Sequence, residues 1–130
     1  IYPGVLWRLF HYQEQDMSWT RDLTCYDAYR QANALYAQVL LNVWTPSHKL
    51  SKLNVLIIDG LIPDKDLIWI HDYYLILLPK LIRAKIPHAR MGFFLHTPFP
   101  SSELFRILPN REREELLLGF LNNKLVGFQT

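Results

Sequence analysis

Short blocks of hydrophobic residues alternate along this chain with polar, turn-like segments. Residues 67–71, 90–95 and 124–128 are bulky apolar runs with the length and composition of buried strands. Residues 5–12 are also bulky and aromatic and follow a Pro-Gly turn signal, so the pattern predicts a strand there too. These runs predict a sheet of four strands.

Between these runs the hydrophobic spacing changes to a helical period. It predicts a helix over residues 23–43, which is the clearest one, and a second over residues 75–85, with Pro79 in its first turn or at a kink. Ser101 is predicted to start a further helix, and residues 110–121 to form the next. Residues 44–63, interrupted by Pro46 and Gly60, are predicted to be an insertion or loop.

Strand and helix therefore alternate along the chain. A helix that connects two neighbouring strands forms a crossover, and crossovers join parallel strands. The predicted fold class is α/β, a parallel sheet with helices on both faces.

Polar residues end two neighbouring strands of this predicted sheet. Asp72 closes the run at residues 67–71, and His96 closes the run at residues 90–95. Ligands bind at the carboxyl ends of strands in open parallel sheets, so both residues are candidate site residues. Asp72 could accept hydrogen bonds from sugar hydroxyls or cap the next helix. His96 could act at a reaction centre or be a core histidine bonded to backbone.

Other polar residues have simpler interpretations. His71 is predicted to point to the opposite side of its strand from Asp72, so it is interpreted as a packing residue. The spacing of the histidines matches no standard ligand pattern, and no metal site is predicted. The charged residues at 111–115 are predicted to be a solvated helix face. Four side chains could bind phosphate or simply be solvated: Arg8, Tyr12, Arg90 and Arg106.

Composition limits the function classes. With 130 residues and 50% hydrophobic content, the chain suits one domain or part of one, and the missing initiator Met suggests a fragment. The net charge of +2 gives no argument for nucleic acid or an anionic membrane as a partner. A single cysteine, Cys25, excludes an internal disulfide and fits a reducing compartment. Without a glycine-rich phosphate loop, a dinucleotide or P-loop enzyme is disfavoured, and no cofactor is predicted.

Four motifs resemble those of the trehalose-6-phosphate synthase family. They are Leu-Phe-His-Tyr at residues 9–12, Trp-Ile-His-Asp-Tyr at 69–73, Gly-Phe-Phe-Leu-His-Thr-Pro-Phe-Pro-Ser-Ser-Glu at 92–103 and Leu-Val-Gly-Phe-Gln-Thr at 125–130. They follow the family's order and intervals, except across residues 44–63, and the resemblance covers nearly the whole chain.

The resemblance implies a cytoplasmic, retaining glycosyltransferase of the GT-B fold, in which two Rossmann-like domains face a cleft. Such an enzyme transfers glucose from UDP-glucose to glucose 6-phosphate in trehalose biosynthesis. Residues 1–130 would be part of the N-terminal, acceptor-side domain, with a possible insertion at residues 44–63. The full protein is expected to bind both substrates, and it could form an oligomer or a trehalose synthase complex. Because the family's donor-diphosphate groups lie outside this chain, the isolated 130 residues are expected to be inactive.

By motif position, the resemblance also implies residue roles. Asp72 resembles the aspartate that holds the acceptor sugar, and Tyr12 resembles the tyrosine near the acceptor phosphate. His96 resembles the histidine beside the donor glucose, so His96 and Asp72 are the catalytic candidates. Tyr26 stands where the family usually has a tryptophan, and it joins Tyr12 and Asp72 as a candidate for glucose 6-phosphate binding. Tyr74 stands where the family has a histidine.

Two alternatives stay open at this point. The first is a catalytically inactive synthase-like domain, in a regulatory subunit or in a trehalose-phosphate phosphatase, which the substitutions at Tyr26 and Tyr74 would fit. The second is an unrelated doubly wound binding domain, because a fold by itself does not specify a function.

Overall fold

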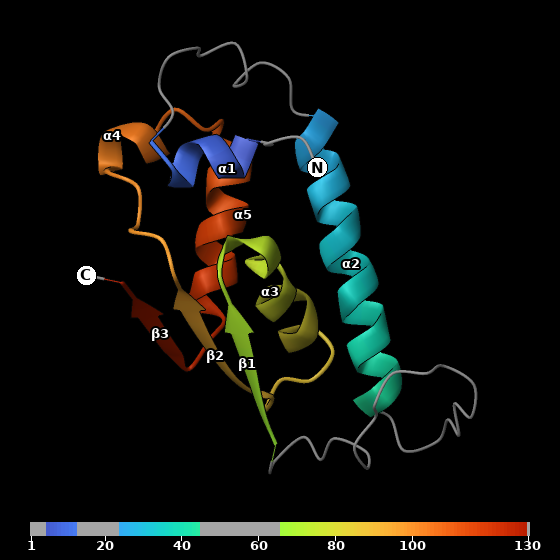
Figure 1. The fold of residues 1–130 in the computed structure, drawn as a ribbon. Coiled ribbons are helices and arrows are strands. Elements are labelled where there is room, and N and C mark those ends of the chain that lie inside the picture. Colours follow the sequence, from blue (N-terminus) through green and yellow to red (C-terminus); the bar gives the residue numbers. More distant parts are fainter. Residues whose placement is uncertain (1–4, 13–23, 45–65, 130) are drawn as a thin grey trace.

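The computed structural model describes residues 5–12, 24–44 and 66–129, which form an alternating α/β structure (Figure 1). Its elements are α1 (Val5–Phe10), α2 (Thr24–Trp44), β1 (Leu67–His71), the 3-10 helix η2 (Tyr73–Leu75), α3 (Leu78–Arg83), β2 (Arg90–Leu95), α4 (Ser102–Phe105), α5 (Asn110–Leu121) and β3 (Leu125–Phe128). The insertion predicted over residues 44–63 lies outside the described residues, apart from the end of α2. No described helix is both long enough and apolar enough to cross a bilayer.

The strands form one parallel sheet in the order β1-β2-β3. Residue 68 pairs with residue 91 across β1 and β2, and residue 93 pairs with residue 126 across β2 and β3. The helix α3 connects β1 to β2, and α4 and α5 connect β2 to β3. The predicted α/β class with a parallel sheet is therefore confirmed.

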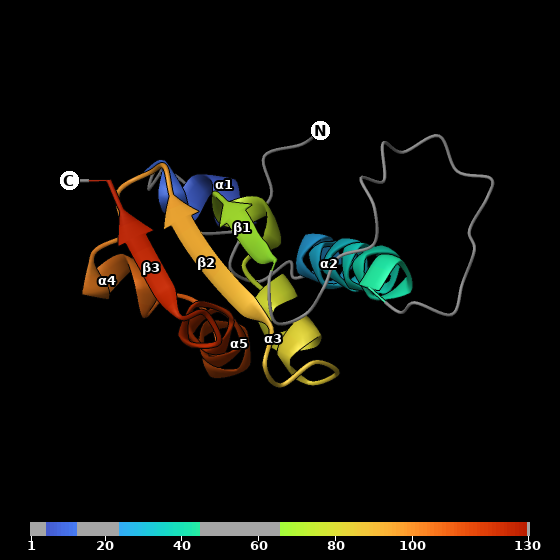
Figure 2. The same ribbon diagram turned by 90° about the horizontal axis from the view of Figure 1, so that it is seen from below.

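Side chains alternate between the two faces of the sheet, as the period of a strand requires. On one face Ile70, Met91, Phe93 and Leu95 are at most 4% exposed, and this face packs against α3 and α5 (Figure 2). The Phe93 ring meets the ring of Phe120 on α5 edge-on, with centroids 5.0 Å apart. The helix α2 packs against α3 rather than entering the sheet layer. The hydrophobic core thus lies between the sheet and these helices.

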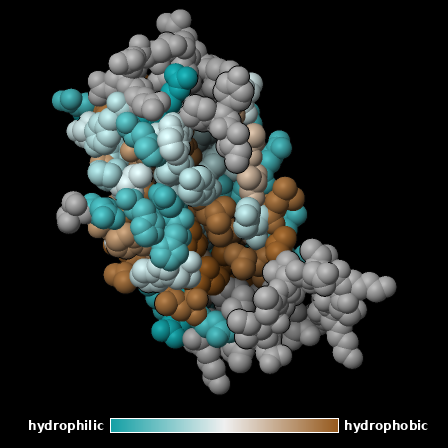
Figure 3. Space-filling view, viewed as in Figure 1, coloured by the Kyte–Doolittle hydropathy of each residue, from teal (hydrophilic) through white to brown (hydrophobic). Residues whose placement is uncertain are grey.

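The opposite face, which we call the open face, carries the other strand residues. Leu67, Trp69 and Leu125 are exposed there, and the space-filling view from this side shows apolar surface (Figure 3). A Cβ atom added to Gly92 would lie 2.5 Å from the Trp69 ring, so the glycine lets that ring lie flat across the neighbouring strand. Among the described residues, the helices that pack on the sheet do so on the core face, whereas the sequence predicted helices on both faces.

The strand predicted for residues 5–12 is wrong, because residues 5–10 form the helix α1. Leu6, Leu9 and Phe10 are buried while Trp7 is exposed, a spacing that places the buried residues on one helical face. The bulky composition suits a strand or a helix. Six residues are too few for the spacing of hydrophobic residues to distinguish the two. A tertiary contact accompanies the helix, since the Phe10 ring stacks on the ring of Tyr73.

The helix predicted for residues 75–85 is shorter than expected. Pro79 lies in the first turn of α3, where its missing N–H has no helical partner to lose. The helix prediction after Ser101 is confirmed, since the Ser101 hydroxyl accepts a hydrogen bond from the Leu104 N–H and caps α4. The prediction for residues 110–121 matches α5.

Candidate functional site

Three of the predicted site residues gather at the carboxyl end of the sheet. Asp72 and His96 directly follow β1 and β2, and α1 lies across this end of the strands (Figure 1). Tyr12, just after α1, donates a hydrogen bond from its hydroxyl to the Phe99 carbonyl, 3.2 Å away in the loop after His96. The fold therefore brings these three residues to the edge where ligands bind in open parallel sheets.

Asp72 has a main-chain conformation that is almost restricted to glycine. Its φ is 64° and its ψ is 175°, and its N–H still donates to the Phe94 carbonyl at 2.8 Å. A non-glycine residue in this region costs about 1–3 kcal/mol, and such residues cluster at active sites and ligand-binding sites. The strained conformation at Asp72 therefore supports the prediction that this residue is part of a ligand-binding site.

The carboxylate of Asp72 is already engaged locally. Its Oδ1 accepts a hydrogen bond from the Tyr73 N–H at 2.9 Å, so Asp72 caps η2. The capping role that the sequence left open is therefore present. It does not exclude ligand binding, because a carboxylate has two oxygens with several acceptor positions and this one is only half-buried.

The main chain after Asp72 is held by side chains of α2. The Tyr29 hydroxyl donates to the Tyr73 carbonyl at 2.8 Å and accepts from the Ile76 N–H at 3.0 Å. Asn33 donates from Nδ2 to the Tyr74 carbonyl at 3.2 Å. Burial raises the pKa of Tyr29, although the hydrogen bond from Ile76 partly offsets this effect, so the hydroxyl stays neutral. The helix α2 therefore fixes the segment that begins at Asp72.

Sequence reasoning missed both of these supporting residues. Asn33 is fully buried in α2 and lies one helical turn after Tyr29. A polar residue in the apolar stripe of the predicted helix was the available signal, because a buried amide needs hydrogen-bond partners.

His96 is exposed and lies against the open face. Its Nε2 is 2.9 Å from the Nδ1 of His71, and the two rings stack with centroids 5.1 Å apart. The Phe94 ring meets the His96 ring edge-on at 4.8 Å. The sequence analysis interpreted His71 as a packing residue, but its side chain is exposed, and its ring stacks on and hydrogen-bonds to a predicted site residue. The register of β1 and β2 brings His71 and His96 together, and local sequence patterns do not predict this contact.

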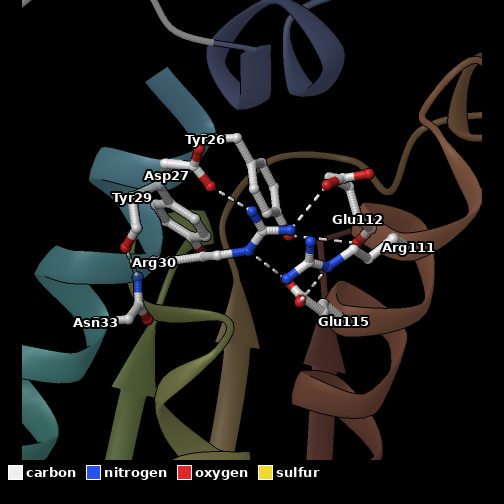
Figure 4. Close-up of polar contacts among 8 residues, drawn as sticks. All are labelled: Tyr26, Asp27, Tyr29, Arg30, Asn33, Arg111, Glu112 and Glu115. Carbon is white, nitrogen blue, oxygen red and sulfur yellow. Dashed lines mark hydrogen bonds and ion pairs between the residues drawn. The ribbon is translucent and has the colours of Figure 1, made fainter. Parts of the chain in front are cut away.

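Tyr26 lies between α2 and α5 (Figure 4). Its side chain is buried, and its hydroxyl donates to the Glu112 carbonyl at 3.3 Å. The Arg30 guanidinium lies 4.6 Å from the centre of the Tyr26 ring and pairs with Asp27, Glu112 and Glu115. The prediction of a solvated charged face at 111–115 is therefore wrong for Glu112, which is 4% exposed. A direct role of Tyr26 in substrate binding stays a prediction.

Tyr74, the other position where the sequence departs from the family, is exposed and lies two residues after Asp72. Its hydroxyl accepts a hydrogen bond from the buried Tyr73 hydroxyl at 3.2 Å, and the two rings are 4.4 Å apart. Burial raises the pKa of Tyr73, and the Tyr74 hydroxyl raises it further. The Trp7 and His11 rings stack next to Tyr73, so aromatic rings line this side of the strand end.

The chain is similar to known proteins over almost its whole length. The family model described as glycosyltransferase family 20 matches residues 3–130. The alpha,alpha-trehalose-phosphate synthase (UDP-forming) A of Dictyostelium discoideum is 42% identical over 127 residues, which are 98% of this chain and 14% of that protein.

Solved structures give the same result for the fold. The N-terminal domain of Candida albicans trehalose-6-phosphate phosphatase is 40% identical, with a TM-score of 0.72 over 98% of this chain and 23% of that one. An alpha,alpha-trehalose-phosphate synthase (UDP-forming) from Burkholderia xenovorans, in complex with glucose-6-phosphate, is 31% identical, with a TM-score of 0.71 over 99% of this chain and 24% of that one. The chain thus spans a quarter or less of each of these relatives. It belongs to glycosyltransferase family 20.

Proposed function

We propose that this chain is part of a UDP-forming alpha,alpha-trehalose-phosphate synthase, which transfers glucose from UDP-glucose to glucose 6-phosphate. Family membership and the named relatives support this reaction. The observation in the structure that carries the proposal is the strained conformation of Asp72 at the carboxyl end of β1. Strain of this kind persists only where the surrounding structure enforces it, and it clusters at active sites and ligand-binding sites.

Within this proposal, residues 1–130 belong to the N-terminal, acceptor-side domain of a GT-B enzyme in the cytoplasm. The full protein binds the two substrates and works as an oligomer or in a trehalose synthase complex.

Each site residue has a proposed role. The Asp72 carboxylate accepts hydrogen bonds from hydroxyls of the acceptor sugar, and Tyr12 lies near the acceptor phosphate. His96 lies beside the donor glucose. Tyr26 influences acceptor binding through the polar contacts between α2 and α5, because its hydroxyl is bonded to the Glu112 carbonyl.

Positioning and electrostatics carry catalysis in such a site. In a retaining transfer, the acceptor oxygen attacks from the face that the diphosphate leaves, and positive charge develops on the donor sugar. A rigid acceptor site reduces the entropy lost in bringing the two substrates together. Asp72 suits this task because its backbone is bonded to β2 and the segment that follows it is bonded to α2.

The test is coupled UDP release by the full-length protein, with and without glucose 6-phosphate. Asp72→Ala should lower kcat/KM for glucose 6-phosphate by at least about tenfold, because hydrogen bonds to a charged group contribute about 1.5–3 kcal/mol. Glu114→Ala, which removes an exposed carboxylate on α5, is the matched control and should leave kcat/KM unchanged.

Other outcomes would contradict the proposal. A well-folded wild type without turnover would favour the inactive regulatory or phosphatase-linked protein. An unchanged kcat/KM in Asp72→Ala would remove Asp72 from the acceptor site. The isolated 130 residues should show no UDP release that depends on glucose 6-phosphate, and such release would show that the donor site needs nothing outside them.

A further inference from the structure

His71 and His96 form a side-chain pair on the open face, at the end of the sheet that carries the site. In the register of the sheet, His71 lies opposite Phe94, and His96 follows two residues later on the same face. The nitrogen atoms are 2.9 Å apart and the rings are 27° from parallel. The contact therefore combines a hydrogen bond with ring stacking.

Flanking aromatic rings and glycines give this pair its geometry. The Trp69 ring lies 6.1 Å from the His71 ring, and the Phe94 ring lies 4.8 Å from the His96 ring. A Cβ at Gly92 would meet the Trp69 ring at 2.5 Å, and a Cβ at Gly127 would meet the Phe94 ring at 2.6 Å. Small residues beneath both flanking rings thus allow four rings to form one layer across β1 and β2.

A hydrogen bond between two imidazoles limits the proton positions of both rings. Either His71 Nδ1 carries the proton and donates a hydrogen bond to His96 Nε2, or His96 Nε2 carries the proton and donates to His71 Nδ1. In each case the remaining nitrogen of His96 has a defined role toward a ligand, as donor in the first and as acceptor in the second. A metal ion is a poorer explanation of the pair, because the described residues contain no group of three or more ligating side chains.

We propose that His71 is a positioning residue for His96. It holds the His96 ring in place, and its Nδ1 bonds to His96 Nε2, so that His96 Nδ1 stays available to hydrogen-bond with the donor glucose. This inference rests on the proposed function, in which His96 lies beside that sugar. Side chains behind a metal-ligating imidazole fix its tautomer and orientation in this way, and their loss costs about 10- to 100-fold in metal affinity or activity.

Variants of the full-length protein separate the two parts of the contact. His71→Phe keeps a stacked ring but removes the nitrogen, and His71→Asn keeps a polar group near the Nδ1 position but removes the ring. His71→Phe should lower kcat/KM for UDP-glucose by about 10- to 100-fold, and His71→Asn should stay within about threefold of wild type. In both variants KM for glucose 6-phosphate should change by less than about twofold, since Asp72 is held by other contacts.

Leu67→Ala is the matched control, because Leu67 is an exposed residue of the same strand and face and should leave both parameters unchanged. If His71→Phe does not fold, His71→Leu takes its place with the same expectation. A wild-type rate in His71→Phe, equal losses in His71→Phe and His71→Asn, or a parallel rise in KM for glucose 6-phosphate would each overturn the inference. An inactive, well-folded wild type would instead remove the proposed function and this inference with it.

Discussion

Asp72 and His96 end neighbouring strands of one sheet, but the protein holds them by different means. Asp72 has a strained backbone, caps η2 and precedes a segment bonded to Tyr29 and Asn33 of α2. His96 is exposed and is contacted by the side chains of His71 and Phe94 on the open face. The main chain of the Asp72 segment is therefore held by hydrogen bonds from side chains of α2, whereas His96 is held by side chains of the open face. Changes in the core should disturb the first position and leave the second largely intact.

The largest expected effect comes from the helix beneath the Asp72 segment. A Cβ at Gly119 would lie 2.0 Å from the Ile76 carbonyl oxygen, and this oxygen belongs to the backbone and cannot turn away. Gly119→Ala should lower the free energy of unfolding by about 3 kcal/mol or more, measured by chemical denaturation of the full-length protein.

Gly127→Ala is the matched change on the His96 side. The three atoms nearest to its Cβ would all belong to the Phe94 ring, and Phe94 is a half-buried side chain on the open face that can shift. We expect a loss below about 1 kcal/mol. Equal losses in the two variants would contradict the difference between backbone and side-chain support.

The second effect concerns the link from α2 to the Asp72 segment. Tyr29→Phe removes a hydroxyl that donates to the Tyr73 carbonyl and accepts from the Ile76 N–H. Because it leaves two backbone groups without this partner, the variant should lose about 2 kcal/mol of unfolding free energy. Tyr36→Phe, at an exposed position of the same helix, should lose almost nothing. A stability of Tyr29→Phe equal to wild type would show that this link does not hold the segment.

The third effect is the pH dependence of the stability that the Tyr29 hydroxyl contributes. Burial raises the pKa of Tyr29 above its ordinary value near 10. Above about pH 10 the unfolded chain loses this proton while the folded protein keeps it, so the unfolded state binds fewer protons and stability falls as pH rises. Below pH 10 the contribution is complete.

Unfolding free energies of wild type and Tyr29→Phe measured between pH 9 and 11 isolate this contribution. The advantage of wild type over the variant should shrink by about 1.4 kcal/mol per pH unit above pH 10. A constant difference over this range would mean that the hydroxyl titrates alike in both states.

The smallest effect tests the strain at Asp72 itself. Asp72→Gly suits the observed φ and ψ and loses little as a cap, so it should raise the free energy of unfolding by about 1 kcal/mol while reducing the proposed transfer. Asp72→Ala keeps the strain and loses the cap, so it should be less stable than wild type. A glycine variant less stable than the alanine variant would show that the backbone at this position is not strained.

Local sequence patterns predicted much of this fold. The bounds of β1 and β2 agree with the apolar runs because each run is bulky, short and ended by a polar residue. The long helix α2 and the cap at Ser101 were also predicted, since both depend on contacts within a few residues. The strand prediction at α1 was wrong because so short a segment does not show whether its hydrophobic spacing is that of a helix or a strand. The helix also contacts Tyr73, which is distant in sequence.

The sequence by itself determined that polar residues end two neighbouring strands, and it placed Asp72 and His96 there. Only the tertiary structure decided what holds them. The register of parallel strands joined His71 to His96, and the packing of α2 joined Tyr29 to the segment after Asp72. These partners lie 25 and 44 residues apart in the chain, so the local spacing of hydrophobic residues cannot predict them. Side-chain partners at such distances are selected by the geometry of the assembled layers.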